Sequence, residues 1–139
     1  MTKTIYYTAS SLDGFIAGPG NDLEWLVSGG LDDGPEDSPF AYAGFEPSVG
    51  VRFYEGSVAD LHGQLAAAAG DRDVWVVGGG DLAGQFLDAG LLDEVVVSFA
   101  PVTLGAGAPL LPRRADWRLR DCGRMGDFAC ARWEVARRA

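Results

Sequence analysis

Apolar positions follow two different periods along this chain, and the period separates expected strands from expected helices. Thr4–Ala9 and Glu94–Ala100 are runs rich in β-branched and apolar residues, and a third run of this kind surrounds Val74. Such continuous apolar runs are typical of strands that are buried on both faces of a parallel sheet. Val51–Tyr54 has a similar but shorter pattern, which predicts a fourth, short strand.

Apolar residues spaced three or four positions apart indicate helices between these strands. Ser57 followed by Asp60 resembles a capping box at the start of a helix that extends to Ala69. The next helix packs through an apolar stripe and ends at Gly90, a residue suited to a left-handed cap. The expected elements and markers are a short helical turn at Leu23–Val27, a helix start at Ser38 and Pro39, the stripe Leu61 and Leu65, and the stripe Leu82, Phe86 and Leu87.

The C-terminal part has strand patterns without an intervening helix. Trp117–Cys122 and Asp127–Val135 predict an antiparallel hairpin that turns near Met125 and Gly126, after an irregular stretch at residues 105–109. In the second strand, Ala129, Ala131, Trp133 and Val135 share one face, which we expect to be the core side. The order of elements predicts an α/β fold, a three-layer sandwich whose mixed, mostly parallel central sheet is extended by this hairpin.

Length and composition favour a single globular domain. The chain has 139 residues, of which 47% are hydrophobic and 22% charged. Its apolar runs are too short to span a membrane. The N-terminus enters the first expected strand without a basic region or cleavage pattern, so we expect no export signal and a cytoplasmic protein.

Charge is unevenly distributed along the chain, whose formal net charge is -9. This acidic balance disfavours nucleic-acid binding. The acidic residues Asp32, Asp33, Glu36 and Asp37 lie among glycine and proline and predict a solvated loop. Residues 113–139 contain most of the arginines, which indicates either a solvated face of the hairpin or a contact between subunits.

Few residues are suited to metal or thiol chemistry. Cys122 and Cys130 are not in a CxxC motif, and we interpret them as reduced, partly buried thiols. His62 is the only histidine and cannot complete a zinc site with two distant cysteines. Its place in a helical run favours a surface or rim position over a general base.

The strand around Val74 ends on Gly78, Gly79 and Gly80, and a helix pattern begins directly afterwards. Glycines allow a close approach to backbone N–H groups, and a helix N-terminus presents unpaired amides and a partial positive charge. This pattern predicts a turn that holds a phosphate group, with a dinucleotide diphosphate as the usual ligand. A tight turn with nothing bound is the alternative.

Four motifs in order then resemble one family. They are Ser11–Ala17 after the first strand, Val76–Gly80 before a helix, Leu91–Glu94 before the next strand, and Ala100–Gly105 after it. Together they resemble the dihydrofolate-reductase-like superfamily, in particular the branch similar to the C-terminal reductase domain of RibD. This resemblance implies hydride transfer from NADPH to a C=N or C=O carbon of a small molecule, with the ribosylamino-pyrimidine of riboflavin biosynthesis as the model substrate.

The resemblance also implies roles for individual residues. Asp13 matches the loop that covers the nicotinamide and is the catalytic candidate, although an Asp-Gly turn residue is the alternative. Asn21 matches the end of a loop in the family, and Trp25 matches an aromatic residue near the substrate, with core packing as the alternative for Trp25. The remaining implied residues are Ala9, Ile16, Gly78, Gly79, Gly80, Asp81 and Leu82 for the cofactor, and Thr103, Leu104 and Gly105 at the pocket rim. Folate is not expected as substrate, because Ser28, Gly29 and Gly30 stand where dihydrofolate reductases have a carboxylate.

One segment of the family pattern is missing between Gly50 and Val51. Relatives have roughly forty to fifty further residues there, including strands of the sheet and the part that grips the adenosine 2'-phosphate of NADPH. A shortened homologue, an omitted stretch and a damaged gene product are all open explanations. The gap favours a rival hypothesis, a non-catalytic binding or assembly relative, while a flavin or other nucleotide in the same cleft is a third. Homodimers are common among relatives, so a homodimer is a further expectation.

Overall fold

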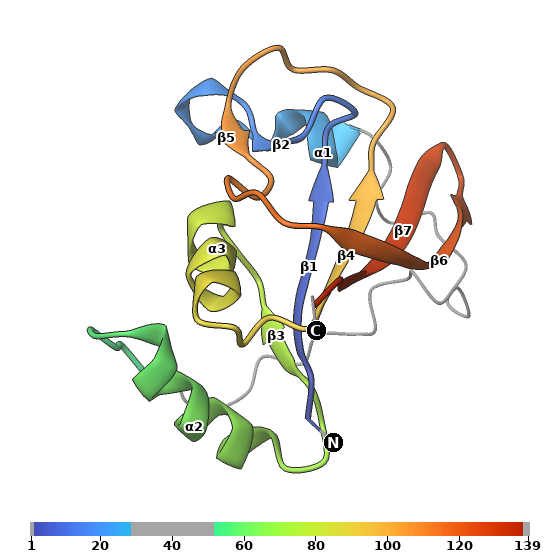
Figure 1. Cartoon of the computed structure of the whole chain (residues 1–139). Coiled ribbons are helices and arrows are strands. Elements are labelled where there is room, and N and C mark those ends of the chain that lie inside the picture. Colours follow the sequence, from blue (N-terminus) through green and yellow to red (C-terminus); the bar gives the residue numbers. More distant parts are fainter. Residues whose placement is uncertain (1, 29–51, 138–139) are drawn as a thin grey trace.

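The computed structural model describes residues 2–28 and 52–137 and forms a mixed five-stranded sheet with helices on both faces (Figure 1). Its strand order is β3-β1-β4-β7-β6, and a second sheet contains only β2 and β5. The strands are β1 (Thr4–Ser10), β2 (Phe15–Ala17), β3 (Val74–Val76), β4 (Glu94–Phe99), β5 (Ala108–Pro109), β6 (Trp117–Met125) and β7 (Phe128–Val135). The helices are the 3-10 turn η1 (Pro19–Asn21), α1 (Glu24–Ser28), α2 (Val58–Ala69) and α3 (Gly80–Asp88).

Three parallel strands form one half of the main sheet, and the antiparallel hairpin forms the other. β1 pairs in parallel with both β3 and β4, so that Tyr6 lies between Val76 and Val95. β4 then pairs antiparallel with β7, which pairs antiparallel with β6. The predicted α/β sandwich with a mixed sheet and a C-terminal hairpin is confirmed.

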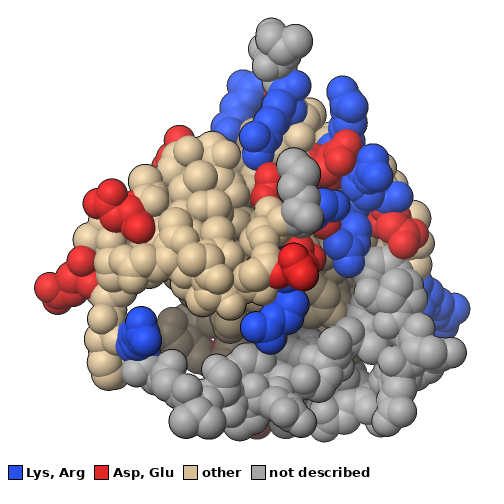
Figure 2. All heavy atoms as spheres, turned by 90° about the horizontal axis from the view of Figure 1, so that it is seen from below, with Lys and Arg blue, Asp and Glu red and all other residues tan. Residues whose placement is uncertain are grey.

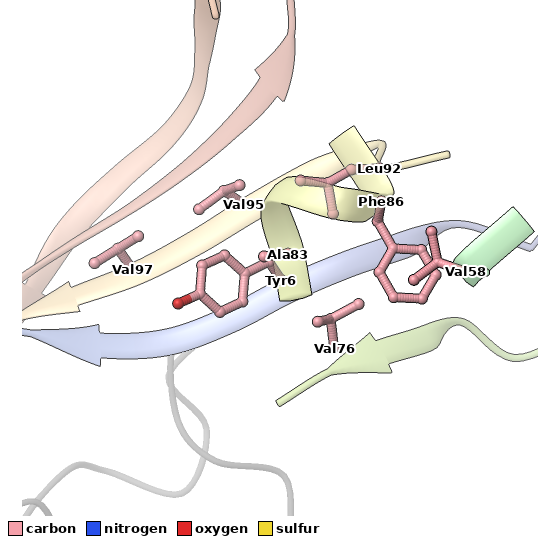
Figure 3. Packing of buried hydrophobic residues seen from close by; sticks show 8 residues of the cluster. All are labelled: Tyr6, Val58, Val76, Ala83, Phe86, Leu92, Val95 and Val97. Carbon is pink, nitrogen blue, oxygen red and sulfur yellow. The ribbon is translucent and has the colours of Figure 1, made fainter. Parts of the chain in front are cut away.

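Two hydrophobic clusters fill the spaces between the sheet and the helices, one on each face of the sheet. On one face, Val58 of α2 and Phe86 of α3 pack against Tyr6, Val76 and Val95 of the sheet. Figure 3 shows the side chains of this cluster gathered between α3 and the strands. On the other face, a second cluster contains Trp25, Val96, Ala100, Met125, Phe128 and Cys130. Because side chains alternate along a strand, neighbouring residues of β4 enter different clusters.

Local sequence signals explain where the helices begin and end. The Ser57 hydroxyl accepts a hydrogen bond from the Asp60 amide at 3.2 Å, so the predicted cap of α2 is confirmed. After α3, Gly90 has a φ of 72°, the left-handed conformation that glycine adopts without strain. Its N–H donates to the Leu87 carbonyl at 3.0 Å and closes the helix end.

The face of β7 expected to be the core side is only partly buried. Ala131 is buried, but Ala129 is exposed and Trp133 and Val135 are partly exposed. Phe128 and Cys130, on the opposite face, join the Trp25 cluster instead. The prediction was wrong in this respect because β7 has α1 packed on the face that alternation assigned to solvent.

Three further sequence predictions need correction or lie outside the described residues. Residues 52–54 contain no strand, since an isolated short apolar run has no neighbouring strand to pair with here. The stretch at 105–109, expected to be irregular, contributes β5 at Ala108–Pro109. The helix start at Ser38, the acidic loop and the gap between Gly50 and Val51 lie outside the described residues.

Charged side chains cover the amino ends of the strands and the hairpin. Glu94 is buried, and its carboxylate pairs with Lys3 at 2.8 Å and Arg132 at 2.6 Å. These two ion pairs, with hydrogen bonds to both cations, hold the pKa of Glu94 below its ordinary value against the opposing effect of burial, which is the largest single influence on it. On the face seen in Figure 2, basic and acidic side chains lie among one another at the upper right.

Several arginines of the hairpin and the residues after it are paired with carboxylates of the same chain. Arg120 lies 3.5 Å from Glu134, and Arg137 lies 3.1 Å from Asp93. Their exposure agrees with the solvated face that the sequence suggested, while a contact between subunits stays a prediction. Among the described helices, none has the length and apolar character needed to cross a membrane.

Candidate functional site

A cavity of about 910 Å³ lies at the carboxyl ends of β1 and β3, next to the start of α3. Protein sites for small molecules commonly have volumes of roughly 300 to 1,000 Å³, so this cavity is large enough for one. Its lining residues are Tyr7, Thr8, Ala9, Ile16, Ala17, Asn21, Leu23, Leu26, Val77, Gly78, Gly79, Gly80, Asp81, Ala108, Pro109 and Pro112. Most of this surface is apolar.

The glycine turn forms the polar edge of the cavity. Gly79 is the N-cap of α3, and no side chain caps the helix there. The first amides of a helix have no carbonyl partner within it, and together with the helix dipole they favour a bound anion. Gly78 has a φ of 142°, which an L side chain rarely adopts, and the peptide bond between Gly78 and Gly79 is cis. The uncapped start of α3 at this turn is thus a position at which an anion could bind.

Gly80 allows α3 to start directly against the opposite wall. A Cβ atom at this position would lie 2.6 Å from the Leu110 carbonyl oxygen and closer still to that of Pro109. The Tyr6 hydroxyl also donates to the Leu110 carbonyl, at 2.9 Å, and burial raises the pKa of Tyr6 to about 12. Residues 109–110 are thus held against both α3 and β1.

The opposite wall is the small sheet formed by β2 and β5. Phe15 pairs with Pro109, and Ala17 pairs with Ala108. Gly107 is required beside this pair, because a Cβ there would collide with the Ala17 carbonyl oxygen. This pairing brings Ile16 and Pro109 together at the cavity although they are far apart in sequence.

The structure gathers six of the seven predicted cofactor residues around this cavity. Ala9 and Ile16 lie on its apolar side, and Gly78, Gly79, Gly80 and Asp81 lie at the turn. Leu82 does not line the cavity and is 38% exposed. Whether these residues hold a cofactor stays a prediction.

Asp13 lies outside the cavity, and its carboxylate connects the loop after β1 to the loop that contains Leu104 and Gly105. Its carboxylate accepts hydrogen bonds from the Ser11 hydroxyl at 2.7 Å, the Leu104 amide at 3.0 Å and the Gly105 amide at 2.8 Å. These bonds, with that from Ser11 the strongest, lower the pKa of Asp13 to about 2. The group is therefore ionised at neutral pH and holds no proton to donate. We interpret it as a positioning residue, while a direct catalytic role stays an untested prediction.

The four expected substrate residues do not line the cavity. Thr103, Leu104 and Gly105 belong to the loop that Asp13 holds. Trp25 is 8% exposed and packs in the cluster with Val96, and its indole N–H donates to the Asp22 carbonyl at 3.1 Å. The alternative interpretation of Trp25, core packing, describes its place in the structure.

Several lining residues were missed because they depend on tertiary contacts. Leu23, Leu26, Ala108, Pro109 and Pro112 come from segments without a recognisable binding pattern. Tyr7 and Thr8 could have been found, because they precede Ala9 at the end of the same strand. Asn21, which matches the end of a loop in the family, does line the cavity.

The charge at the cavity edge is negative. Asp81 accepts hydrogen bonds from Arg113 and from Gln85, both at 3.0 Å, and these bonds lower its pKa. The Arg113 guanidinium also donates to Asp88 at 2.8 Å. Because one guanidinium serves two carboxylates, the three groups together carry a net negative charge at neutral pH.

The remaining candidates are structural. His62 lies in α2, and its Nε2 is 2.9 Å from the Thr4 hydroxyl at the other end of β1. Its ring also packs edge-on against Phe86. Cys122 is exposed, contrary to the expected partial burial, and Cys130 is buried with its sulfur 3.4 Å from the Ser98 hydroxyl.

Known proteins resemble this chain in sequence and in fold. The "Uncharacterized protein YwjB" of Bacillus subtilis is 25% identical over 143 residues, covering 78% of this chain and 82% of YwjB. The crystal structure of a putative riboflavin biosynthesis protein from Shewanella sp. PV-4 has a TM-score of 0.67 at 19% identity, and the match covers 98% of this chain and all of that chain.

A bifunctional protein shares the fold over part of its length. It is the diaminohydroxyphosphoribosylaminopyrimidine deaminase/5-amino-6-(5-phosphoribosylamino)uracil reductase from Thermotoga maritima, with a TM-score of 0.62 and 15% identity. The match covers 97% of this chain but only 57% of that protein. At such low identity, these structures establish the fold, which is that of RibD reductase-like domains.

The family model of the RibD C-terminal domain matches residues 55–125 of this chain. That range contains the glycine turn, α3 and the loop whose amides bind Asp13. It therefore includes the lining residues from Val77 to Asp81 and those from Ala108 to Pro112. The chain belongs to the RibD C-terminal domain family, whose members have a dihydrofolate-reductase-like fold.

Proposed function

We propose that this protein is an NADPH-dependent reductase that transfers hydride to a C=N or C=O carbon of a small heterocyclic molecule. The observation that carries this proposal is the cavity at the glycine turn, where the uncapped N-terminus of α3 meets a mostly apolar pocket. Membership in the RibD C-terminal domain family supports the choice of reaction. Hydride chemistry is supplied by the cofactor, and the protein supplies binding and orientation.

The turn and the apolar wall have different parts in this proposal. The amides of Gly79, Gly80 and Asp81 would bind the diphosphate of the dinucleotide. Ala9 and Ile16 offer an apolar surface against which a flat ring can pack. An apolar wall also excludes water from the reacting atoms and holds two rings in register, which is the main protein contribution to such a reaction.

Proton transfer does not depend on a buried acid among the described lining residues. Within that set, Asp81 is the only carboxylate, and Arg113 and Gln85 hold it ionised. The proton that accompanies hydride therefore comes from solvent at the open side of the cavity. The pH profile of the activity is therefore expected to show no titration of Asp13 or Asp81 near neutral pH.

Binding of NADPH is the first test, and intrinsic fluorescence can measure it. The Trp75 indole donates to the Tyr7 carbonyl at 3.0 Å, and Tyr7 lines the cavity, so a ligand there is expected to quench Trp75. Saturable quenching and a rise in Tm with NADPH would support the proposal. Absence of both at millimolar NADPH would favour a non-catalytic relative, and release of another bound nucleotide on denaturation, identified by mass spectrometry, would point to a different ligand in the same cavity.

A matched pair of variants tests the location. Val77 lines the cavity and is 62% exposed, whereas Leu119 is 49% exposed and lies outside it on β6. We expect Val77→Glu to weaken NADPH binding about tenfold, because a carboxylate beside the turn repels a diphosphate. Leu119→Glu should bind NADPH as the wild type does. Equal affinities for both variants would place the dinucleotide elsewhere.

A further inference from the structure

The cavity lacks a cationic group among its described lining residues. Of these residues, Asp81 alone has a charged side chain, and the other polar contributors are Thr8, Asn21 and Tyr7. From this we infer that the substrate is an uncharged heterocycle without a phosphate group, unlike the phosphoribosyl compound named for the Thermotoga relative. This inference rests on the proposed function and names the substrate class of the same site.

The guanidinium closest in sequence to the cavity wall is already occupied. Pro112 lines the cavity, but the side chain of Arg113 turns onto α3, where it pairs with Asp81 and Asp88. Gly84 allows this close approach, since a Cβ there would lie 2.8 Å from the Arg113 Cζ. Recruiting Arg113 to a substrate phosphate would leave two carboxylates without their cation.

Two other cations, Lys3 and Arg132, are held away from the cavity by a buried carboxylate. Lys3, the only lysine of the chain, pairs with buried Glu94 at the amino end of β1, whereas the cavity lies at the carboxyl end. Arg132 pairs with the same carboxylate. Residues 28–51 contain no lysine or arginine at all, so that segment has no side-chain cation to offer a phosphate at neutral pH.

The physical cost of a phosphate here is high. Moving a doubly charged phosphate out of water is unfavourable unless cations or several hydrogen bonds replace the water. The cavity offers one built set of amides, at the N-terminus of α3, and the dinucleotide diphosphate takes these in the proposed function. A second phosphate would meet an apolar wall, the Asp81 carboxylate and a chain with a net charge of -9.

The test compares one pyrimidine with and without its phosphate. Binding of 5-amino-6-(ribosylamino)uracil and of its 5'-phosphate to the NADP⁺-loaded protein is measured by calorimetry, and NADPH oxidation with each is followed at 340 nm. We expect the phosphate ester to bind at least tenfold more weakly than the uncharged compound, or not detectably. Equal or tighter binding of the ester would overturn the inference, whether or not either compound is reduced.

A gain-of-cation variant makes the test independent of turnover. Leu23 lines the cavity and is 49% exposed, and Leu119 on β6 is also 49% exposed but lies outside it. Leu23→Arg should strengthen binding of the phosphate ester about tenfold, while Leu119→Arg should leave it unchanged. If Leu23→Arg has no effect, or both variants have the same effect, the missing cation is not what excludes phosphate.

The two proposals fail in different ways. Failure of NADPH to bind in the fluorescence titration would remove the proposed function. NADPH binding together with tight binding of the phosphate ester would leave the reductase intact and overturn only the inference on substrate charge.

Discussion

Replacing Gly80 by alanine tests the packing that creates the cavity. Gly80 is buried at the first turn of α3, and its position against residues 109–110 leaves no space for a methyl group. The new Cβ would lie 2.6 Å from the Leu110 carbonyl oxygen, a distance that real Cβ atoms essentially never show, and 3.0 Å from the carbonyl carbon. Backbone atoms cannot swing away as a flexible side chain can, so α3 and β5 must separate.

The magnitude follows from two opposing effects. Overpacking of a closely packed site costs about 1 to 3 kcal/mol, whereas alanine in place of glycine stabilises a helix by at most about 1 kcal/mol. We therefore expect Gly80→Ala to lower the free energy of unfolding by about 1 to 2 kcal/mol, which for a chain of this size is a fall in Tm of roughly 4 to 8 °C. Urea denaturation followed by circular dichroism gives the free energy directly.

Two other helix glycines provide the controls. At Gly63 in α2, no atom lies within 4 Å of the place that a Cβ would take, so Gly63→Ala should be neutral or stabilising. At Gly84 the obstacle is the flexible Arg113 side chain, so Gly84→Ala should displace that side chain and its ion pairs at a smaller cost than the backbone clash at Gly80. Our reasoning is refuted if Gly80→Ala is as stable as Gly63→Ala.

Three further outcomes follow from groups described above. The pKa of Asp13 is about 2 in the folded chain and 3.8 ordinarily, so its ionised form stabilises the fold above about pH 4. Urea denaturation at several pH values compares the wild type with Asp13→Asn. The difference in free energy of unfolding should be constant above pH 5 and shrink as the pH falls toward 2. Tyr6→Phe removes the donor to the Leu110 carbonyl and should cost about 1 kcal/mol in the same measurement, whereas no change would mean that water replaces the bond. With a thiol reagent, Cys122 should react at once and Cys130 only after denaturation; two fast thiols would contradict the burial of Cys130.

Local patterns predicted most elements of this fold. The capping box at Ser57, the left-handed Gly90 and the apolar run of β4 each depend on residues within a few positions of one another. The glycine turn was visible for the same reason, because Gly78–Gly80 and the start of α3 are contiguous. Signals of this kind survive without any tertiary information.

The rest depended on contacts that no local pattern encodes. The wall of β2 and β5 forms from residues about ninety positions apart, and neither strand is longer than three residues. Asp13 in an Asp-Gly turn has the same local sequence whether it caps its own turn or receives the amides of Leu104 and Gly105. The sequence around Trp25 likewise does not indicate whether its side chain packs in the core or lies beside a substrate.

The ion pair between Lys3 and Glu94 has a practical consequence. Lys3 is the only lysine in the sequence, and it lies at the edge of the sheet opposite the glycine turn. Reagents that modify lysine therefore have one target in this sequence, and it lies at this edge. A molecule immobilised through Lys3 would present the cavity at the glycine turn to the solution.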